Sequence, residues 1–365
     1  MFIVRKNFPV FVTGASGFIG GQLARRLLAD GRRVRVLSRR PLPELETLGA
    51  EVIPGDLHDR HALERGCRSA ETVFHVAGRV GVWGPPEDFF RVNVEGTRNL
   101  LVACREAKVP RLVYTSSPSV VYNGGDLRHV NESAPLCTQA PCAYPTSKAT
   151  AEREVLAAHG PELATIALRP HLVWGPGDKN VVPRILTLAR AGKLKIIGPG
   201  RNRVDITPIN NVVDAHLLAE GALLTGSRAP FGSAGAVATP PQAGNSSASR
   251  PPHHPGGRAY FITNGEPVVL WDWINEVLRG VGIPEIKSHV PLPVAYAAGA
   301  ALETVWRLTG RAGEPPMTRF VAKEMATDHW FDISAARRDL GYHPLVSVTQ
   351  ATAELIEHYK AGNPF

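Results

Sequence analysis

The strongest constraint on the fold lies at the start of the chain, where an apolar run meets a glycine-rich turn and then a helical pattern. The run at residues 9–13 is followed by Gly14, Gly17 and Gly20, spaced GxxGxxG. The segment Phe18–Ala29 then repeats apolar residues on one helical face. Glycines at a strand-to-helix turn let the backbone approach a pyrophosphate that rests on the helix N-terminus. The pattern therefore predicts a dinucleotide-binding unit.

The rest of the first half repeats this alternation of short apolar runs with helical patterns. The runs read as buried strands at residues 33–38, 51–54, 72–77, 111–116 and 164–169. Uninterrupted apolar strands that alternate with helices indicate an α/β fold with a doubly wound parallel sheet of the Rossmann type.

The predicted sheet leaves much of the 365-residue chain for other parts. The predicted division is a dinucleotide-binding domain at residues 7–178, returning segments near 204–224 and 259–265, and a smaller C-terminal substrate lobe at 179–203 and 266–365. Residues 226–258 are crowded with Gly, Pro, Ser and Ala. Such a stretch cannot bury enough apolar surface to offset its ordering entropy, so we expect a low-complexity insertion.

Composition narrows the class of partner. The formal net charge is +8, yet no basic run carries interleaved aromatics, so we expect small anionic molecules rather than nucleic acid. The four cysteines show no metal-ligand spacing, which predicts reduced thiols, no metal and a cytoplasmic protein. The longest apolar run, at residues 294–302, is far shorter than the ~20 residues of a membrane-spanning helix.

The end of the second predicted strand indicates which cofactor binds. A carboxylate there would bond the ribose hydroxyls of NAD, but the sequence has Ser38, Arg39 and Arg40 instead. The planar guanidinium of arginine suits a 2′-phosphate, although a solvated basic loop would have the same composition. We therefore expect NADP(H) to be preferred, with NAD(H) as the alternative.

Further residues are predicted to contact the cofactor. Asp56 and Leu57 follow the third predicted strand, where Asp56 would accept a hydrogen bond from adenine, and capping of the next helix is its alternative role. Ala77 and Gly78 follow the fourth strand, where small residues let a cofactor lie against the backbone. The set is completed within the glycine-rich turn by Ser16, Phe18 and Ile19.

A tyrosine and a lysine four residues apart predict the reactive centre. Tyr144 and Lys148 would project from the same side of a helix, with Pro145 suited to its first position. A nearby ammonium, together with the positive nicotinamide ring of an oxidised cofactor, favours the tyrosinate, which moves the phenol from its usual pKa of about 10 toward the range of a proton shuttle. Ser117 follows the fifth predicted strand at the same sheet edge and can supply a hydroxyl to a substrate oxygen.

In this order, the residues resemble the extended short-chain dehydrogenases, within the 3β-hydroxysteroid dehydrogenase-like branch. The resemblance spans nearly the whole chain apart from the insertion. It implies that Ser117 polarises a carbonyl or alcohol oxygen, that Tyr144 donates or accepts the proton, and that Lys148 lowers the tyrosine pKa and holds the nicotinamide ribose. Asn93 matches the family asparagine of a proton relay or of helix geometry, and Pro170 matches a backbone segment beside the nicotinamide.

Two enzyme groups of that branch are similar in further stretches, at residues 203–209 and 315–344. They are the 2-alkyl-3-oxoalkanoate reductases and the decarboxylating sterol-4α-carboxylate 3-dehydrogenases, which both act at an oxygen β to a carboxylate. Residues 77–83 and 174–178 look closer to the reductases. The resemblance therefore implies an NADP(H)-dependent oxidoreductase that interconverts a β-keto acid and a β-hydroxy acid, with the sterol enzyme as the alternative.

Other functions are weighed by particular residues. A sugar-nucleotide 4,6-dehydratase of this superfamily would carry acids where Ser116 and Ser117 stand, so dehydration is disfavoured. A nucleotide-sugar epimerase shares the serine, tyrosine and lysine and stays open. A non-catalytic NADP sensor usually lacks these three residues and is disfavoured.

The expected substrate is a hydrophobic small molecule with a carboxylate. Arg169, Lys179 and Arg203 are unranked candidates to bind that carboxylate. The apolar helical pattern at residues 293–308 predicts a helix packed on the sheet, which alone would account for the pattern. The functional alternative is that this helix also walls a channel for an alkyl chain or sterol. A homodimer, and a peripheral contact with a membrane or with a pathway enzyme, stay open.

Overall fold

A seven-stranded parallel sheet forms the centre of the computed structural model, which describes residues 8–226 and 255–362. Its strand order is β12-β7-β5-β4-β1-β2-β3. The strands are β1 (Val10–Thr13), β2 (Val34–Ser38), β3 (Glu51–Pro54), β4 (Thr72–His75), β5 (Arg111–Thr115), β7 (Ala164–Pro170) and β12 (Arg258–Ile262). The order reverses at β1, so the predicted doubly wound Rossmann-type sheet is confirmed, and its switch point lies between β1 and β4.

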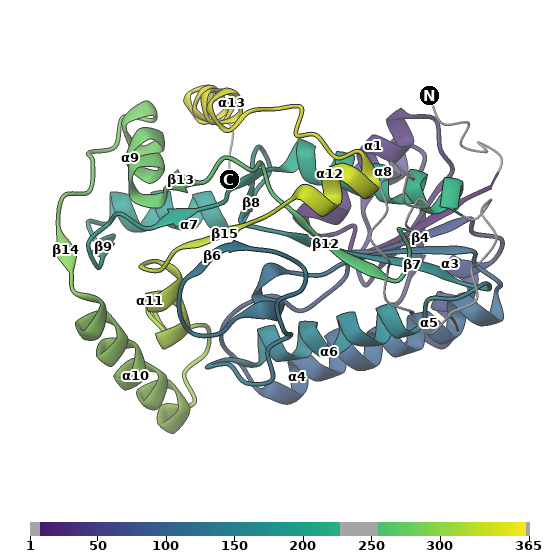
Figure 1. The fold of residues 1–365 in the computed structure, drawn as a ribbon, viewed down its shortest axis with the longest axis horizontal. Coiled ribbons are helices and arrows are strands. Elements are labelled where there is room, and N and C mark those ends of the chain that lie inside the picture. The colour runs from purple at the N-terminus through teal and green to yellow at the C-terminus, as the bar shows by residue number, and fades with distance from the viewer. Residues whose placement is uncertain (1–7, 227–254, 363–365) are drawn as a thin grey trace, which may run out of the picture.

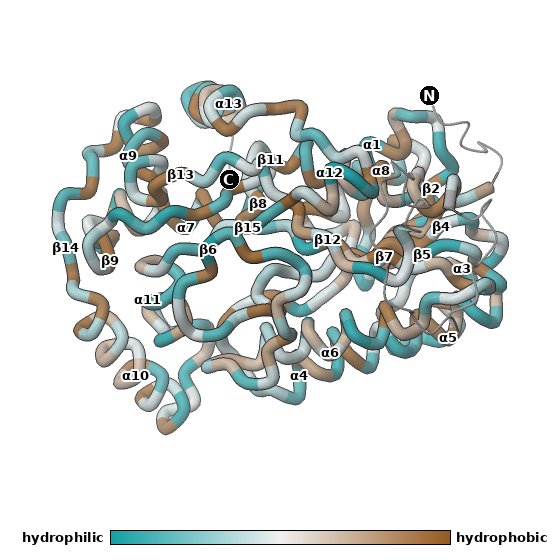
Figure 2. Tube along the Cα trace, viewed as in Figure 1, coloured by the Kyte–Doolittle hydropathy of each residue, from teal (hydrophilic) through white to brown (hydrophobic). Residues whose placement is uncertain are grey.

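Helices cover both faces of this sheet (Figure 1). One face carries α1 (Phe18–Ala29), α8 (Ile209–Gly226) and α12 (Ser334–Leu340), and the other carries α3 (Arg60–Cys67), α5 (Gly96–Glu106) and α6 (Ala143–Ala157). Successive strand residues point to opposite faces. Val10 and Val12 therefore enter one core and Phe11 the other. This double covering is why the strands are continuously apolar, as the hydropathy colours of Figure 2 show around β4 and β7.

The C-terminal lobe lies at one end of the sheet, on the left in Figure 1. Its helices are α7 (Val181–Arg190), α9 (Leu270–Gly280), α10 (Leu292–Thr309), α11 (Arg319–Glu324) and α13 (Val348–Lys360). They pack around a core that includes Trp174, Trp271 and Trp273. No helix in the described part of the chain is both long and apolar enough to cross a membrane.

Short strands join this lobe to the carboxyl ends of the central strands. A four-stranded sheet has the order β13-β10-β15-β6, with β6 (Leu127–Val130), β10 (Arg203–Val204), β13 (Val268–Val269) and β15 (His329–Phe331). Two further pairs link β8 (Val173–Trp174) to β11 (Thr207–Pro208) and β9 (Ile196–Ile197) to β14 (His289–Val290). The remaining helices are α2 (Pro43–Thr47) and α4 (Pro86–Phe90), with a π-helical turn at Arg91–Glu95 and a 3-10 turn at Pro118–Val121.

The last residues of the predicted insertion, from Pro255 onward, form hydrogen bonds with the central sheet. The Gly257 nitrogen donates to the Thr165 oxygen at 2.7 Å, and the Tyr260 hydroxyl donates to the Pro255 oxygen at 3.1 Å. Residues 255–257 are therefore attached to the central sheet, and Arg258 is already the first residue of β12. The remaining part of the predicted insertion, residues 227–254, lies outside the described residues, and the domain boundaries stay a prediction.

Candidate active site

The turn between β1 and α1 forms a backbone cradle at the switch point of the sheet. Gly14 has a φ of +77°, and a Cβ there would lie 2.6 Å from the Ala77 nitrogen. A Cβ on Gly20 would collide with the Gly14 carbonyl oxygen, so a side chain at either position would force the turn open. Helix α1 starts after Gly17 with no side-chain cap and no acidic residue in its first turn. Its first N–H groups can therefore bind an anion, which fits a dinucleotide pyrophosphate.

The loop after β2 carries the predicted phosphate-binding residues. Ser38 is buried, and its hydroxyl donates to the Arg40 oxygen at 2.7 Å, which fixes the start of the loop. Arg39 and Arg40 are exposed, and neither forms an ion pair with any residue that the structure describes. Two uncompensated guanidiniums at this edge fit a 2′-phosphate.

The structure separates two roles that the sequence left open for Asp56. Its Oδ1 accepts a hydrogen bond from the His58 nitrogen at 2.8 Å within the loop. Helix α3 is instead capped by Asp59, whose Oδ1 accepts from the Ala62 nitrogen at 2.9 Å. The alternative role as a helix cap was therefore wrong for Asp56, which leaves its carboxylate at the sheet edge for the predicted adenine contact.

The other predicted cofactor residues lie along the carboxyl edge of the same sheet. Ala77 follows β4, and its nitrogen donates to the Thr13 hydroxyl at 3.2 Å. A Cβ on Gly78 would lie 3.2 Å from Asn93 Oδ1 and 3.8 Å from Lys148 Nζ, so this glycine opens directly onto the lysine. The remaining members are Ser16, exposed in the first turn, Phe18 and Ile19, half-buried at the start of α1, Leu57, buried after β3, and Pro170, at the end of β7.

Lys148 is buried beneath this edge. Its Nζ donates to the Thr115 oxygen at the end of β5 at 2.6 Å, and it lies 4.2 Å from the centroid of the Tyr114 ring. Burial lowers the pKa of Lys148 to about 7, although the Glu152 carboxylate opposes this shift. The ammonium therefore holds a fixed place but gives up its proton easily.

Asn93 lies beside the lysine in the π-helical turn Arg91–Glu95. Its Nδ2 donates to Ser147 Oγ at 3.0 Å and to the Arg79 oxygen at 3.1 Å. Its Oδ1 accepts from the Arg79 nitrogen at 2.7 Å. These hydrogen bonds tie α6 to the loop after β4. π-helical turns often occur at functional sites, but a relay role for Asn93 stays a prediction.

Tyr144 and Ser117 approach each other from α6 and from the end of β5. Helix α6 begins at Ala143, so Pro145 is its third residue rather than its first, although it is still in the first turn, where no backbone partner is lost. Burial raises the pKa of Tyr144, and a side-chain hydrogen bond with Ser117 lowers it only in part. In the protein alone the effect of burial is therefore larger than that of the Ser117 hydrogen bond, and the lowering of this pKa by Lys148 together with an oxidised nicotinamide stays a prediction.

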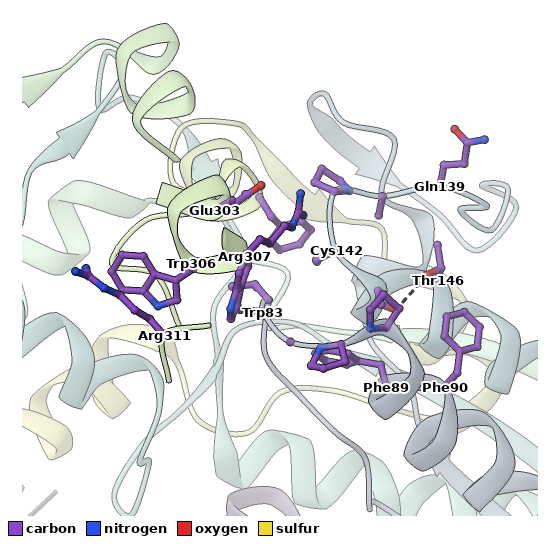
Figure 3. A pocket seen from close by; sticks show the side chains of 18 of the residues that line it. Trp83, Phe89, Phe90, Gln139, Cys142, Thr146, Glu303, Trp306, Arg307 and Arg311 are labelled. Carbon is purple, nitrogen blue, oxygen red and sulfur yellow. Dashed lines mark hydrogen bonds between the residues drawn. The ribbon is translucent and has the colours of Figure 1, made fainter. Parts of the chain in front are cut away.

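A cavity of about 920 Å³ opens beside the N-terminus of α6 (Figure 3). Cys142 and Ala143, which directly precede Tyr144, line it together with Thr146. Its other walls come from residues 82–86, 89 and 90, from residues 138–141, from helix α10 with the loop that follows, and from Phe320 of α11. Most of the lining is apolar or aromatic, as expected for a hydrophobic substrate.

None of the three cations proposed from the sequence lines this cavity. Arg169 is buried and paired with Glu152, with 3.0 Å between Nε and Oε2, so it is a structural residue. The guanidinium of Arg203 lies over the Trp330 ring at 6.0 Å. The cavity instead has Arg307 and Arg311, which the sequence did not single out. No local sequence motif identifies these two arginines, because only the folded chain brings them to the same cavity as the segment 82–90.

The lowered pKa of Lys148 predicts a pH-dependent stability. Between about 7 and the ordinary value of 10.5, the unfolded chain binds a proton that the folded chain has lost, so stability rises with pH in this range. In Lys148→Met this contribution is absent. We expect the free energy of unfolding of the wild type to gain on that of the variant from pH 7 to pH 10, as measured by urea denaturation. The exposed Lys193→Met should run parallel to the wild type, and parallel curves for Lys148→Met would contradict the burial of a titrating lysine.

Comparisons with known proteins agree with this geometry. Residues 11–294 match the model of the 3-beta hydroxysteroid dehydrogenase/isomerase family. The 2-alkyl-3-oxoalkanoate reductase of Shewanella oneidensis is 41% identical, over 97% of this chain and 87% of the relative. The human decarboxylating sterol-4-alpha-carboxylate 3-dehydrogenase is 32% identical, over 96% of this chain and 87% of its own.

The solved structures agree as well. The structure of MoeE5 in complex with UDP-glucose and NAD superposes with a TM-score of 0.69 at 26% identity, covering 98% of this chain and all of the other. The fold, the arrangement of the site and the sequence match lead to one conclusion: the chain belongs to the 3-beta hydroxysteroid dehydrogenase/isomerase family of oxidoreductases.

Proposed function

We propose that this protein is an NADP(H)-dependent reductase that converts a 2-alkyl-3-oxoalkanoate to the 3-hydroxy acid and keeps the carboxylate. The observation that carries the proposal is the hydrogen bond between Ser117 and Tyr144 beside a largely apolar cavity, with Lys148 of the same helix at the end of β5, close to Gly78. The name of the Shewanella relative, at 41% identity over nearly the whole chain, supports the substrate class.

The residues present fit a nicotinamide dinucleotide. The Gly14 turn would receive the pyrophosphate, Asp56 the adenine, and Arg39 with Arg40 the 2′-phosphate. Lys148 would hold the ribose, because its Nζ lies beside Gly78, 3.8 Å from where a Cβ on that glycine would be. When bound, such a cofactor supplies the hydride for reduction. The NAD named in the MoeE5 structure supports the cofactor class, and the two arginines support NADP(H) within it.

The protein's own residues account for the proton transfer. The Ser117 hydroxyl would donate a hydrogen bond to the substrate carbonyl and polarise it. Because burial raises the pKa of Tyr144, the phenol keeps its proton at neutral pH and can donate it to the same oxygen. The Lys148 ammonium, one helical turn along α6, would then stabilise the tyrosinate that remains. A protonated phenol suits reduction at neutral pH, whereas oxidation would need a higher pH.

Helix α10 supports a peripheral contact with a membrane or a pathway enzyme. It exposes Val294, Val305 and Leu308, with Leu308 83% exposed, while Trp306 and Arg307 line the cavity. A helix that covers the substrate cavity and presents apolar side chains outward could receive a poorly soluble lipid. The contact itself, like a homodimer, stays a proposal.

Product identification tests the proposed reaction. The enzyme is incubated with NADP⁺ and either a 2-alkyl-3-hydroxyalkanoic acid or a 4α-carboxysterol, because hydride transfer is reversible and the hydroxy acids are stable. We expect NADPH formation with the alkyl acid, and mass spectrometry should find the 3-oxo acid or its decarboxylated ketone. Turnover of the sterol acid alone would overturn the substrate class, while leaving the roles of Ser117 and Tyr144 in place.

Cofactor preference provides a second test. The ratio of kcat/KM for NADPH over NADH should favour NADPH in the wild type and fall by about 10-fold or more in Arg39→Ala, because one charge-assisted phosphate contact is lost. Arg33→Ala is the matched control, since Arg33 is also exposed but lies before the amino end of β2, whereas Arg39 follows its carboxyl end. Equal kcat/KM for both cofactors in the wild type would refute the NADP(H) assignment.

A further inference from the structure

We propose that Arg307 of α10, assisted by Arg311 and the Trp306 indole, binds the carboxylate of the substrate. This inference rests on the proposed function, because it assigns the anionic part of that substrate to a particular wall of the cavity. Figure 3 shows Trp83 and Arg307 toward the middle of the cavity, with Trp306 and Arg311 on one side and Phe89 and Phe90 on the other.

The two guanidiniums bring uncompensated positive charge to the cavity. Neither Arg307 nor Arg311 forms an ion pair with an acid among residues 8–226 and 255–362. The acid that shares this lining, Glu303, is already paired, because its Oε2 lies 2.8 Å from Arg319 Nη2 and its Oε1 accepts from the Arg319 nitrogen at 2.7 Å. The cavity wall therefore carries a net positive charge that an anionic ligand would neutralise.

Tryptophan rings hold both guanidiniums in place. The Arg307 guanidinium lies 5.5 Å from the centroid of the Trp83 ring, and that of Arg311 lies 5.2 Å from the Trp306 ring. Stacking of this kind orients the planar donor groups before a ligand arrives, which reduces the entropy lost on binding.

A buried donor without a partner lies at the same place. Trp306 Nε1 is shielded from solvent, and it has no hydrogen-bond partner among the residues that the structure describes. An unpaired buried N–H is costly. A carboxylate oxygen between this indole and the arginines would satisfy it, which is a second and independent indication of an anion.

The position of this cluster agrees with the chemistry of a β-keto acid. The carboxylate of such an acid is separated by a single carbon from the carbonyl that reacts, so its cation has to belong to the cavity next to Tyr144. Arg307 shares this cavity with Cys142 and Ala143, the two residues before Tyr144. The aromatic part of the lining, including Phe89 and Phe90, is then left for the alkyl chains.

Binding measurements test the assignment without requiring turnover. Calorimetric titration uses a 2-alkyl alkanoic acid, which lacks the 3-oxygen, and its methyl ester, with the wild type, Arg307→Met and Arg307→Lys. Arg307→Met should weaken binding of the acid by about 10- to 100-fold and leave the ester unchanged, since a charge-assisted contact is lost while the apolar wall remains. Arg307→Lys should recover part of the difference.

Arg203→Met is the matched control, because Arg203 is an exposed arginine stacked on a tryptophan outside the cavity. It should bind acid and ester as the wild type does. An Arg307→Met protein that keeps the wild-type preference for the acid, or one that loses acid and ester binding equally with an unchanged melting temperature, would overturn the inference. Tight acid binding that depends on Arg307, in a protein that does not oxidise the 3-hydroxy acid, would support this site and refute the proposed reaction instead.

Discussion

The hydrogen bond from the buried Lys148 ammonium to the Thr115 oxygen fixes helix α6 to the end of β5. One turn further along the helix, Glu152 is paired with Arg169 of β7, and both side chains are buried. Loss of either partner of such a pair would leave an unpaired charge out of water, so the helix has little freedom to shift its register. Ser117 and Tyr144 can meet because these two contacts hold their elements at a set distance and rotation.

The same constraint connects the cofactor side of the site to the substrate side. Asn93 ties α6 to the loop after β4 through Ser147, and that loop leads to Trp83 in the wall of the cavity. The tail of the chain returns to the central domain through β15, which pairs with β6, the next strand after β5 in the chain. Segments from both halves of the sequence are therefore needed before the cavity has a complete lining.

The sequence predicted the parts of the molecule that depend on local pattern. Helix α1 has its predicted bounds, because a glycine turn marks its start and Gly31, with a φ of +74°, follows its last turn. The strands were recognised because both of their faces are covered. The pairing of Ser117 with Tyr144 could be predicted for a related reason, since both residues lie at the carboxyl ends of the strands of one parallel sheet.

The features that the sequence did not predict depend on contacts between distant segments. The pKa of Tyr144 is raised by the burial of its phenol, and no local sequence motif predicts how deeply the phenol is buried. The cap of α3 belongs to Asp59 because the turn after β3 extends further than the pattern indicated. Arg307 and Arg311 can be recognised as cavity residues only from the fold, which brings the end of α10 to the segment 82–90, more than two hundred positions earlier in the chain.

The most direct measurement of the central claim is the turnover of Tyr144→Phe with NADPH and a 2-alkyl-3-oxo acid, alongside its affinity for NADPH. If Tyr144 donates the proton, kcat should fall by ~10²–10⁴. The dissociation constant for NADPH should stay close to that of the wild type, because the cradle and Lys148 are untouched. A Tyr144→Phe protein with near-normal kcat would contradict the account.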